Sequence, residues 1–394
     1  MKLKGLQRIA LYIFFFSINF EVWDPFNVSF SISRMTGLFY LLTVLPNLSY
    51  FIRLSLLKRF VTPILIFFML LTLMSLFNVN YISSSFFDFS IFQNIILFIL
   101  LVNHERKEEG ILERGMFCFA LGSICLAILY KMGIGISVVD LRVTIFDDNQ
   151  NSVGMRMAIS IIILIWIVAK NNLNFKKWRF LLCFSFPLML KLMADTGSRV
   201  AFISFALMIL VGIVLYKTKR NSIASKIFIF IVGIGLAFLF WNYLSSSQVL
   251  IDRLQRVQEG SDLGGRTEIW ENLGPFILDN LFFGRGETGY TLYSVETMGV
   301  RWSPHNVIFE VLSYTGVVGL FFYLLFCFRV FKVCFKRYKF SGSLIQFLLL
   351  IPFMGLLLSG QLLVVKIGWV IMAFGASNIL YLYYHSGKEI LKKV

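Results

Sequence analysis

The sequence predicts an all-α polytopic membrane protein with about twelve transmembrane helices and one large periplasmic loop. The 394 residues are 58% hydrophobic and only 15% charged, and their mean hydropathy is +0.79. The charged residues cluster between apolar runs of about 20 residues, the length that crosses a bilayer core as a helix. A water-soluble domain of this size needs far more polar surface, so a soluble fold is excluded.

Twelve apolar runs define the expected spans, each as a single helix because backbone polar groups in a bilayer must be satisfied within their own segment. The fourth run is the least regular, since it contains Asp88, Gln93 and Asn94. The last two runs could instead form a tight hairpin around Gln361–Lys366. The expected spans are 6–22, 35–52, 60–79, 86–103, 111–134, 153–170, 177–194, 199–216, 225–244, 305–328, 344–362 and 366–384.

The spans divide the chain into three expected segments. Residues 1–244 hold nine helices, residues 245–304 form the periplasmic loop, and residues 305–394 hold three more helices. Most of the 37 Lys and Arg lie in alternate short connections, which the positive-inside rule assigns to the cytoplasm together with both termini. The first run is expected to be an uncleaved span, because no small-residue cleavage site follows it. The net charge of +16 therefore reflects topology and contact with anionic lipid, and a nucleic-acid partner is not expected.

The loop 245–304 is too long to be an idle connection. It carries five Arg against eight carboxylates. Short surface helices are expected at 251–257 and, after Gly264-Gly265, from about Thr267 to Leu273. The apolar side of the second helix could rest on the bilayer or on the ends of the spans.

Metal and redox chemistry receive little support. The five Cys lie in or beside apolar runs without a CxxC spacing, and none falls in the loop 245–304. The outer connection 135–152 contains Asp147-Asp148-Asn149, for which a turn is a commoner explanation than a metal site. No metal ligand and no cofactor is therefore predicted.

Two arginines on the expected outer face could bind an anion. Arg199 ends the stretch Asp195-Thr196-Gly197-Ser198-Arg199 at the mouth of the eighth span. There it could snorkel to lipid headgroups or hold a phosphate oxygen with its planar, bidentate donors. Arg266 follows two glycines at an expected helix start, a pattern that suits anion binding but also occurs in plain turns.

His305 is the candidate for proton transfer. Of the three histidines, His104 and His385 are expected on the cytoplasmic side, which leaves His305 facing outward. An imidazole titrates near neutrality and suits general acid–base chemistry, although a capping or interfacial histidine is the alternative. Glu310 follows one turn into the tenth span, where a carboxylate needs a partner or a wet cavity.

Three further residues could contact the substrate. Asn306 adjoins His305, and Arg285 and Arg301 lie earlier in the loop, where they could bind glycan or phosphate or simply be solvated. With Glu310, they form the expected substrate-binding set.

The order of these motifs resembles the O-antigen ligase and O-antigen polymerase superfamily. The matching elements are Arg266-Thr-x-x-Trp270, Phe283-Gly284-x-Gly286, and His305-Asn306 followed by Gly316-Val-Val-Gly319, with Thr196-Gly197-Ser198-Arg199 upstream. The resemblance implies a metal-independent, inverting glycosyltransferase of the bacterial inner membrane. It implies a donor glycan linked to undecaprenyl pyrophosphate, bound at the periplasmic side, and catalytic roles for Arg199, Arg266 and His305.

Several readings remain open within and outside this superfamily. A polymerase of surface-polysaccharide repeat units is favoured over a ligase, because no feature of the chain could be tied to a lipid A–core acceptor. A chain-length regulator is left open as a partner beside membrane lipid. A transporter or flippase would show polar spans and repeat symmetry, whereas the charges within the expected spans are few, among them Lys131, Arg156 and Glu310. A non-enzymatic scaffold would not need an outward histidine near two arginines.

Overall fold

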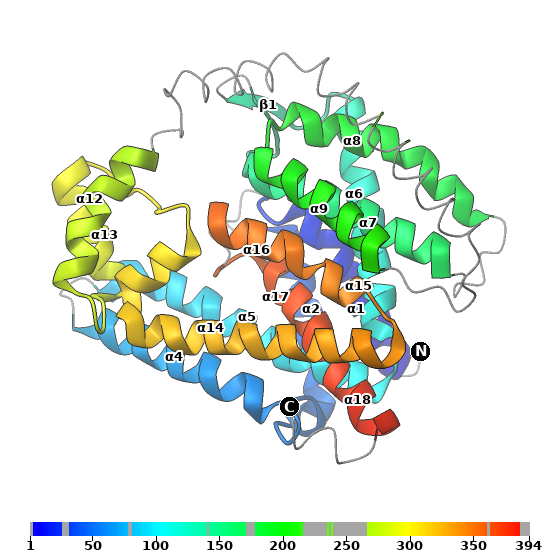
Figure 1. Ribbon diagram of the computed structural model, residues 1–394, viewed down its shortest axis with the longest axis horizontal. Helices are drawn as coiled ribbons and strands as arrows, with labels where there is room; N and C mark the ends of the chain where they lie inside the picture. Colours follow the sequence, from blue (N-terminus) through cyan, green and yellow to red (C-terminus); the bar gives the residue numbers. More distant parts are fainter. Residues whose placement is uncertain are drawn as a thin grey trace. The chain divides into compact units, whose positions relative to one another are not determined.

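Helices make up nearly all the regular structure in the computed structural model (Figure 1). It describes residues 3–25, 31–77, 81–139, 142–170, 178–215, 266–360 and 363–386, with the single positions 235 and 238. Among these residues, four helices are long and apolar enough to cross a membrane: α4 (Lys58–Leu76), α6 (Ile111–Lys131), α7 (Gln150–Lys170) and α14 (Val307–Ser341). They agree with the expected mainly helical membrane protein, whereas the number of twelve spans stays a prediction.

The chain divides into two units that alternate along the sequence. The first comprises Met1–Leu48, Glu108–Gly260 and Ser341–Gly355, and the second comprises Ser49–Lys107, Ser261–Phe340 and Leu356–Val394. The division falls within α3 (Leu48–Phe51) and within α16 (Leu350–Ser359).

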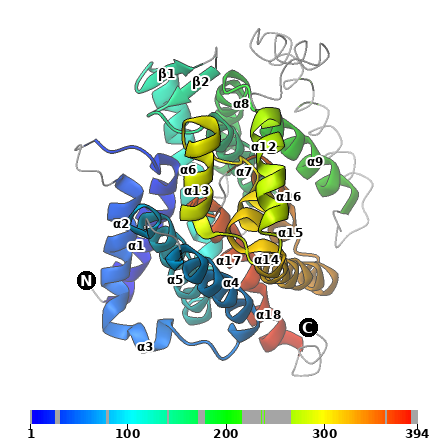
Figure 2. The same cartoon turned by 90° about the vertical axis from the view of Figure 1, so that its left-hand side faces the viewer.

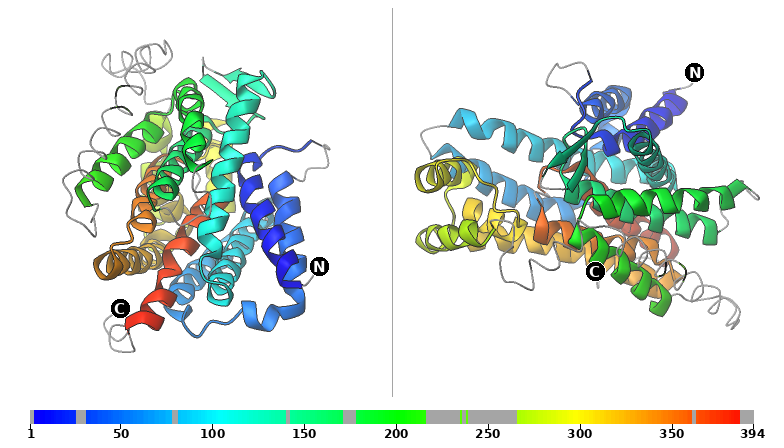
Figure 3. Two further views of the ribbon diagram at one scale, coloured as in Figure 1. Left: turned by 90° about the vertical axis from the view of Figure 1, so that its right-hand side faces the viewer. Right: turned by 90° about the horizontal axis from the view of Figure 1, so that it is seen from above.

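The first unit is a helical assembly with one small hairpin. Helix α1 packs against α2 and α6, and α7 packs against α6, α8 and α9 (Figure 3). Leu11, Phe14 and Phe15 of α1 are fully buried in its core. Besides α6 and α7, its elements are α1 (Leu3–Ser17), η1 (Ile18–Phe20), α2 (Ile32–Val44), η2 (Leu45–Asn47), β1 (Ile136–Val139), β2 (Arg142–Ile145), η3 (Trp178–Ser185), α8 (Phe186–Asp195), α9 (Arg199–Leu215) and α15 (Ile345–Leu348).

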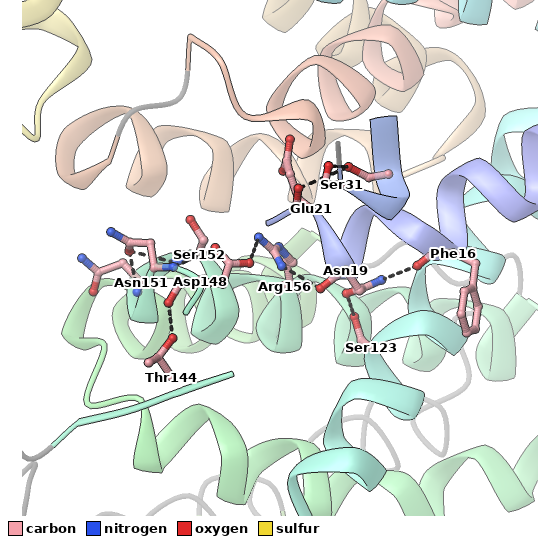
Figure 4. A network of polar contacts seen from close by, with 12 residues as sticks. Phe16, Asn19, Glu21, Ser31, Ser123, Thr144, Asp148, Asn151, Ser152 and Arg156 are labelled. Atoms are coloured by element: carbon pink, nitrogen blue, oxygen red, sulfur yellow. Dashed lines mark hydrogen bonds and ion pairs between the residues drawn. The ribbon is translucent and has the colours of Figure 1, made fainter. Parts of the chain in front are cut away.

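A polar network inside the first unit surrounds Arg156 of α7 (Figure 4). Arg156 is 1% exposed; its guanidinium donates to the Asn19 carbonyl at 2.9 Å and pairs with the Asp148 carboxylate at 2.5 Å. The Asn19 amide oxygen accepts a hydrogen bond from Ser123 at 2.6 Å, and the Ser123 hydroxyl also meets that of Ser160 at 2.6 Å. A buried charge is costly unless it is paired and hydrogen-bonded, so this network allows α7 to carry an arginine.

The connection 135–152 contains structure that the all-α prediction missed. Strands β1 and β2 pair antiparallel, with Ile136 opposite Ile145 and Val139 opposite Arg142. Four-residue strands give almost no periodic signal in a sequence. The Asn149 side chain accepts the N–H of Asn151 at 2.9 Å, as a cap at the start of α7. The turn explanation of the Asp-Asp-Asn stretch is consistent with this contact.

The second unit gathers helices from three parts of the chain. Helices α4 and α17 pack against α5, and α13 packs against both α4 and α5 (Figures 1 and 2). The irregular fourth run forms a continuous helix, α5, in which the Asn94 amide donates to the Val364 carbonyl at 3.1 Å. The elements of this unit, with α4 and α14, are α5 (Tyr81–Lys107), α12 (Arg266–Asp279), α13 (Gly286–Met298), α17 (Lys366–Ala376) and α18 (Asn378–Ser386).

Helix α4 contains a proline whose effect is compensated by a side chain. Pro63 has no N–H, so the carbonyl of Arg59, four residues earlier, loses its partner in the helix. The guanidinium of Arg329 in α14 donates to that carbonyl. The arginine thereby satisfies a backbone acceptor that would otherwise be orphaned.

Several elements of the structure differ from the expected ones, and some expected elements fall outside the described residues. The seventh expected span, 177–194, consists of the 3₁₀ helix η3 followed by α8, with Pro187 in the first turn of α8. The loop 245–304 contains the expected helix near Thr267, which is longer than predicted (α12), and a second helix, α13. The ninth expected span, apart from positions 235 and 238, lies outside the described residues, as do the helix expected at 251–257 and Gly264-Gly265.

Candidate functional site at the start of helix α14

The segment 301–306 connects α13 to α14 in the second unit and carries His305 (Figure 2). Helices α12 and α13 and the first turns of α14 are joined by aromatic contacts. The Phe276 ring lies 4.6 Å from that of Tyr293 and 5.9 Å from that of Tyr290, and Tyr290 lies 5.9 Å from Tyr314. These contacts fix the two loop helices against the start of α14.

Side chains from α12 and α13 bind the backbone of the segment 301–306. The Trp270 indole donates to the Pro304 carbonyl at 3.0 Å, and the Tyr290 hydroxyl donates to the Trp302 carbonyl at 2.9 Å. The N–H of Trp302 donates to the Ser294 hydroxyl at 2.9 Å. Burial raises the pKa of Tyr290 to about 12, so its hydroxyl remains a donor at neutral pH. The segment therefore has a defined shape without regular secondary structure.

His305 has an unusual backbone conformation within this segment. Its φ is 50°, in the left-handed region that few residues other than glycine adopt. Its N–H donates to the Ser303 hydroxyl at 3.2 Å. The next residue, Asn306, accepts the N–H of Ile308 at 2.9 Å through its side chain, and so caps α14. Capping is the role that the structure gives Asn306; contact with a substrate stays a prediction.

Glu310 lies one turn into α14, five residues after His305. It is 1% exposed, and its Oε1 accepts a hydrogen bond from the Ser303 hydroxyl at 3.2 Å. Its Oε2 has no hydrogen-bond partner among the described residues. The Ser303 hydroxyl therefore connects the buried carboxylate to the backbone of His305.

Arg301 is tied to a second buried carboxylate. Its guanidinium pairs with Glu287 of α13, which is 1% exposed, while 54% of the Arg301 side chain remains exposed. The Thr291 hydroxyl also donates to the Glu287 carboxylate, at 3.0 Å. Burial raises the pKa of Glu287 above its usual value, and the nearby Arg301 charge opposes this shift. The Arg301 guanidinium is therefore partly exposed and is held in place by the buried Glu287 carboxylate.

The two glycine motifs of the sequence meet in space. Gly316 breaks α14 with φ 62° and ψ −165°, a conformation that is essentially restricted to glycine. The N–H groups of Val317 and Val318 donate to the carbonyls of Leu281 (2.9 Å) and Phe282 (3.2 Å), which lie just before Gly284. A Cβ on Gly316 would lie 2.3 Å from the Phe282 carbonyl group. The glycines therefore dock the connection between α12 and α13 onto the break in α14.

The remaining candidates of the second unit are placed less fully. Arg266 is the first residue of α12, one turn before Trp270, and its side chain lies outside the described part of the structure. Arg285 is exposed and precedes α13, and its N–H donates to the Ser313 carbonyl at 3.0 Å.

Arg199 belongs to the first unit, where it is the first residue of α9. The preceding Thr196 and Ser198 are fully buried, and the Ser198 hydroxyl accepts the N–H of Ala201 at 3.3 Å. Arg142 of β2 donates to the Thr196 carbonyl at 2.8 Å. The expected convergence of Arg199 with Arg266 and His305 stays a prediction.

Comparison with known families identifies the region that contains these residues. Residues 184–324 match the Wzy_C family model, described as O-antigen ligase. The match spans all seven candidate residues, from Arg199 to Glu310. The resemblance to the O-antigen ligase and polymerase superfamily is therefore confirmed over residues 184–324. No curated protein matches the chain.

Sequence reasoning missed most of the residues that support the candidate site in the matched region. Tyr290 and Glu287 were not singled out, and Ser303 was noted only as part of the stretch 303–306, although each bonds the segment 301–306 or its side chains. Of these three, only Glu287 could have been found from the sequence, because an acidic residue in an apolar neighbourhood needs a partner. The serine and tyrosine gave no signal, since such residues are ordinary in a polar loop.

Proposed function

We propose that this protein is a membrane glycosyltransferase that transfers a glycan from a polyprenyl-pyrophosphate carrier to a hydroxyl group of an acceptor sugar. The family match supports glycan transfer of the ligase or polymerase type. The observation that carries the residue assignment is the left-handed backbone of His305, in a segment bonded by side chains from three helices. Strained residues that their surroundings over-determine cluster at active sites.

The proposed reaction is a displacement at the anomeric carbon of the donor. The acceptor oxygen forms a bond to that carbon while the bond to the pyrophosphate oxygen breaks, which inverts the configuration. The electron pair leaves with the pyrophosphate, and the acceptor proton passes to His305. Positioned proton transfer contributes about 10²–10⁴ in rate. Arginines stabilise the charge that develops on the leaving pyrophosphate, a task that a divalent metal performs in other enzymes.

Arg266 is the stronger of the two arginine candidates. It starts α12 one turn before Trp270, whose indole is bonded to the Pro304 carbonyl beside His305. Positions four residues apart share a helix face, and this register, together with the family motif, is the reason for ranking Arg266 first. The role of Arg199 rests on the family motif alone.

The direct test is a set of single variants in the producing strain. His305→Ala and Arg266→Lys are expected to abolish long-chain glycan while leaving the amount of protein intact, because each removes a contribution of about 10²-fold or more. His385→Ala serves as the matched control and keeps the wild-type glycan. Wild-type chain lengths in His305→Ala or Arg266→Lys would contradict the assignment. Purified protein is expected to keep its turnover of lipid-linked repeats in the presence of a chelator.

Two acceptors fit this chemistry. We favour another lipid-linked repeat unit, which makes the protein a polymerase of surface polysaccharide. The description of the matching family favours the second candidate, a ligase that moves the finished chain to lipid A–core or another acceptor. Glycan analysis in a deletion strain separates them: loss of a polymerase leaves product capped with a single repeat, and loss of a ligase leaves unattached polyprenyl-linked chains.

A further inference from the structure

The Ser303 hydroxyl lies between the candidate base and a buried carboxylate. It donates to Glu310 Oε1 at 3.2 Å and accepts the N–H of His305 at 3.2 Å. A hydroxyl has a single proton, so donating it to the carboxylate turns a lone pair toward a second donor. The orientation that receives the His305 N–H is therefore set by Glu310.

The burial of Glu310 keeps it from contacting a substrate, but its position suits a role in orienting the segment 301–306. It is 1% exposed, and its N–H donates to the Asn306 carbonyl at 2.9 Å in the first turn of α14. Its Oε1 faces the hydroxyl of the segment 301–306. A carboxylate in this position contacts the segment from within the protein.

The backbone of His305 needs such support. With φ at 50° it lies in a region that side-chain-bearing residues rarely occupy, and only surrounding contacts can hold it there. Trp270 binds the carbonyl of Pro304, and the Asn306 side chain caps the helix that follows. Ser303 acts between these two anchors, on the N–H of His305 itself.

We propose that Glu310 is a positioning residue that fixes His305 through the Ser303 hydroxyl. The role rests on the proposed function only in that His305 is the group whose placement matters for turnover. Glu310 acts from the protein interior, through its bond to Ser303, and does not touch the glycan. The pair Ser303–Glu310 behaves as one unit, because neither group orients His305 without the other.

Ser294 provides a matched control. Its hydroxyl also donates once and accepts once in the same region, to the Val300 carbonyl and from the Trp302 N–H, both at 2.9 Å. It is fully buried but contacts neither His305 nor a carboxylate by these bonds. A loss that merely loosens the region should therefore appear equally in Ser294→Ala and Ser303→Ala.

The kinetic test uses purified full-length protein and the lipid-linked glycan extracted from the deletion strain. Ser303→Ala and Glu310→Leu, which each remove the hydrogen bond between the two side chains, are expected to lower kcat about 10²-fold with little change in KM, since small misplacement of a reacting group has effects of this size. Ser303→Thr restores most of the activity. The double variant is no worse than either single variant. Equal losses in Ser294→Ala and Ser303→Ala, or additive losses in the double variant, would overturn the proposal.

A second measurement does not depend on activity. Diethyl pyrocarbonate modifies histidines, and peptide mass spectrometry reports each site, with His385 as the internal reference. Ser303→Ala and Glu310→Leu are expected to speed the modification of His305 about fivefold, the effect of losing one hydrogen bond, and to leave the reference unchanged. An unchanged rate at His305 contradicts the positioning role. Wild-type glycan in His305→Ala would instead refute the proposed function, while the modification rates still decide the positioning of His305.

Discussion

Replacing Gly316 with alanine tests the account of the broken helix α14. The left-handed φ of 62° with ψ −165° costs a side-chain-bearing residue about 1–3 kcal/mol. The new Cβ would also lie 2.3 Å from the Phe282 carbonyl group, so the backbone segments around Gly316 and Phe282 must move apart. That separation breaks up to three backbone hydrogen bonds, from Val317, Val318 and Arg285, each worth about 1 kcal/mol. The expected loss is about 4–6 kcal/mol.

Gly299→Ala is the matched control for this prediction. Gly299 has a similar φ of 73°, but a Cβ there meets nothing within 4 Å. Its replacement should cost only the backbone strain, about 1–2 kcal/mol. Thermal unfolding of the two purified variants in the same detergent gives the comparison. We expect Gly316→Ala to lower Tm by about 10 °C and Gly299→Ala by about 2–4 °C. Equal shifts would refute the idea that backbone docking at Gly316 holds the connection 281–285.

Three further substitutions test other contacts. Burial raises the pKa of Glu287, so the folded protein binds its proton more tightly than the unfolded chain, and stability falls as pH rises from the usual value near 4.5 through the raised one. Glu287→Gln should remove this fall in Tm and the exposed Glu296→Gln should not; parallel curves would contradict the shift. Arg329→Leu should cost about 1–3 kcal/mol by orphaning a carbonyl, and Pro63→Ala in the same chain should recover it, as chemical denaturation can measure. Asn306→Ala should lose about 1 kcal/mol of helix capping and Asn306→Asp much less, also by denaturation; equal losses would exclude the cap.

The helical nature of the fold was predictable because apolar runs of membrane length carry a strong signal. The helices α4, α6 and α7 lie close to the expected ranges. Breaks inside such runs were harder to predict. Gly316 lies within an apolar stretch, and nothing local shows that its partners are the carbonyls of residues 281 and 282. A contact between segments more than 30 residues apart depends on tertiary structure, which propensity does not contain.

The residues of the candidate site also differ in whether the sequence alone could predict them. His305 could be singled out because an imidazole is rare in this chain and suits proton transfer. The support around it could not, since serine and tyrosine hydroxyls have many possible partners until the fold fixes one. Glu310 shows both cases: its position in an apolar run predicted a need for a partner, but only the structure identifies Ser303 as that partner.

The break at Gly316 also separates two mechanical tasks within one long helix. The part after the break can follow the thickness of the surrounding bilayer, where a change of a few ångströms is met by tilting a span. The first nine residues pack against α12 and α13, and the connection 281–285 is bonded to both sides of the break, at Ser313 and at Val317 and Val318. A tilt of the later part would therefore reach the connection 281–285 through Val317 and Val318 before it reaches the segment that carries His305.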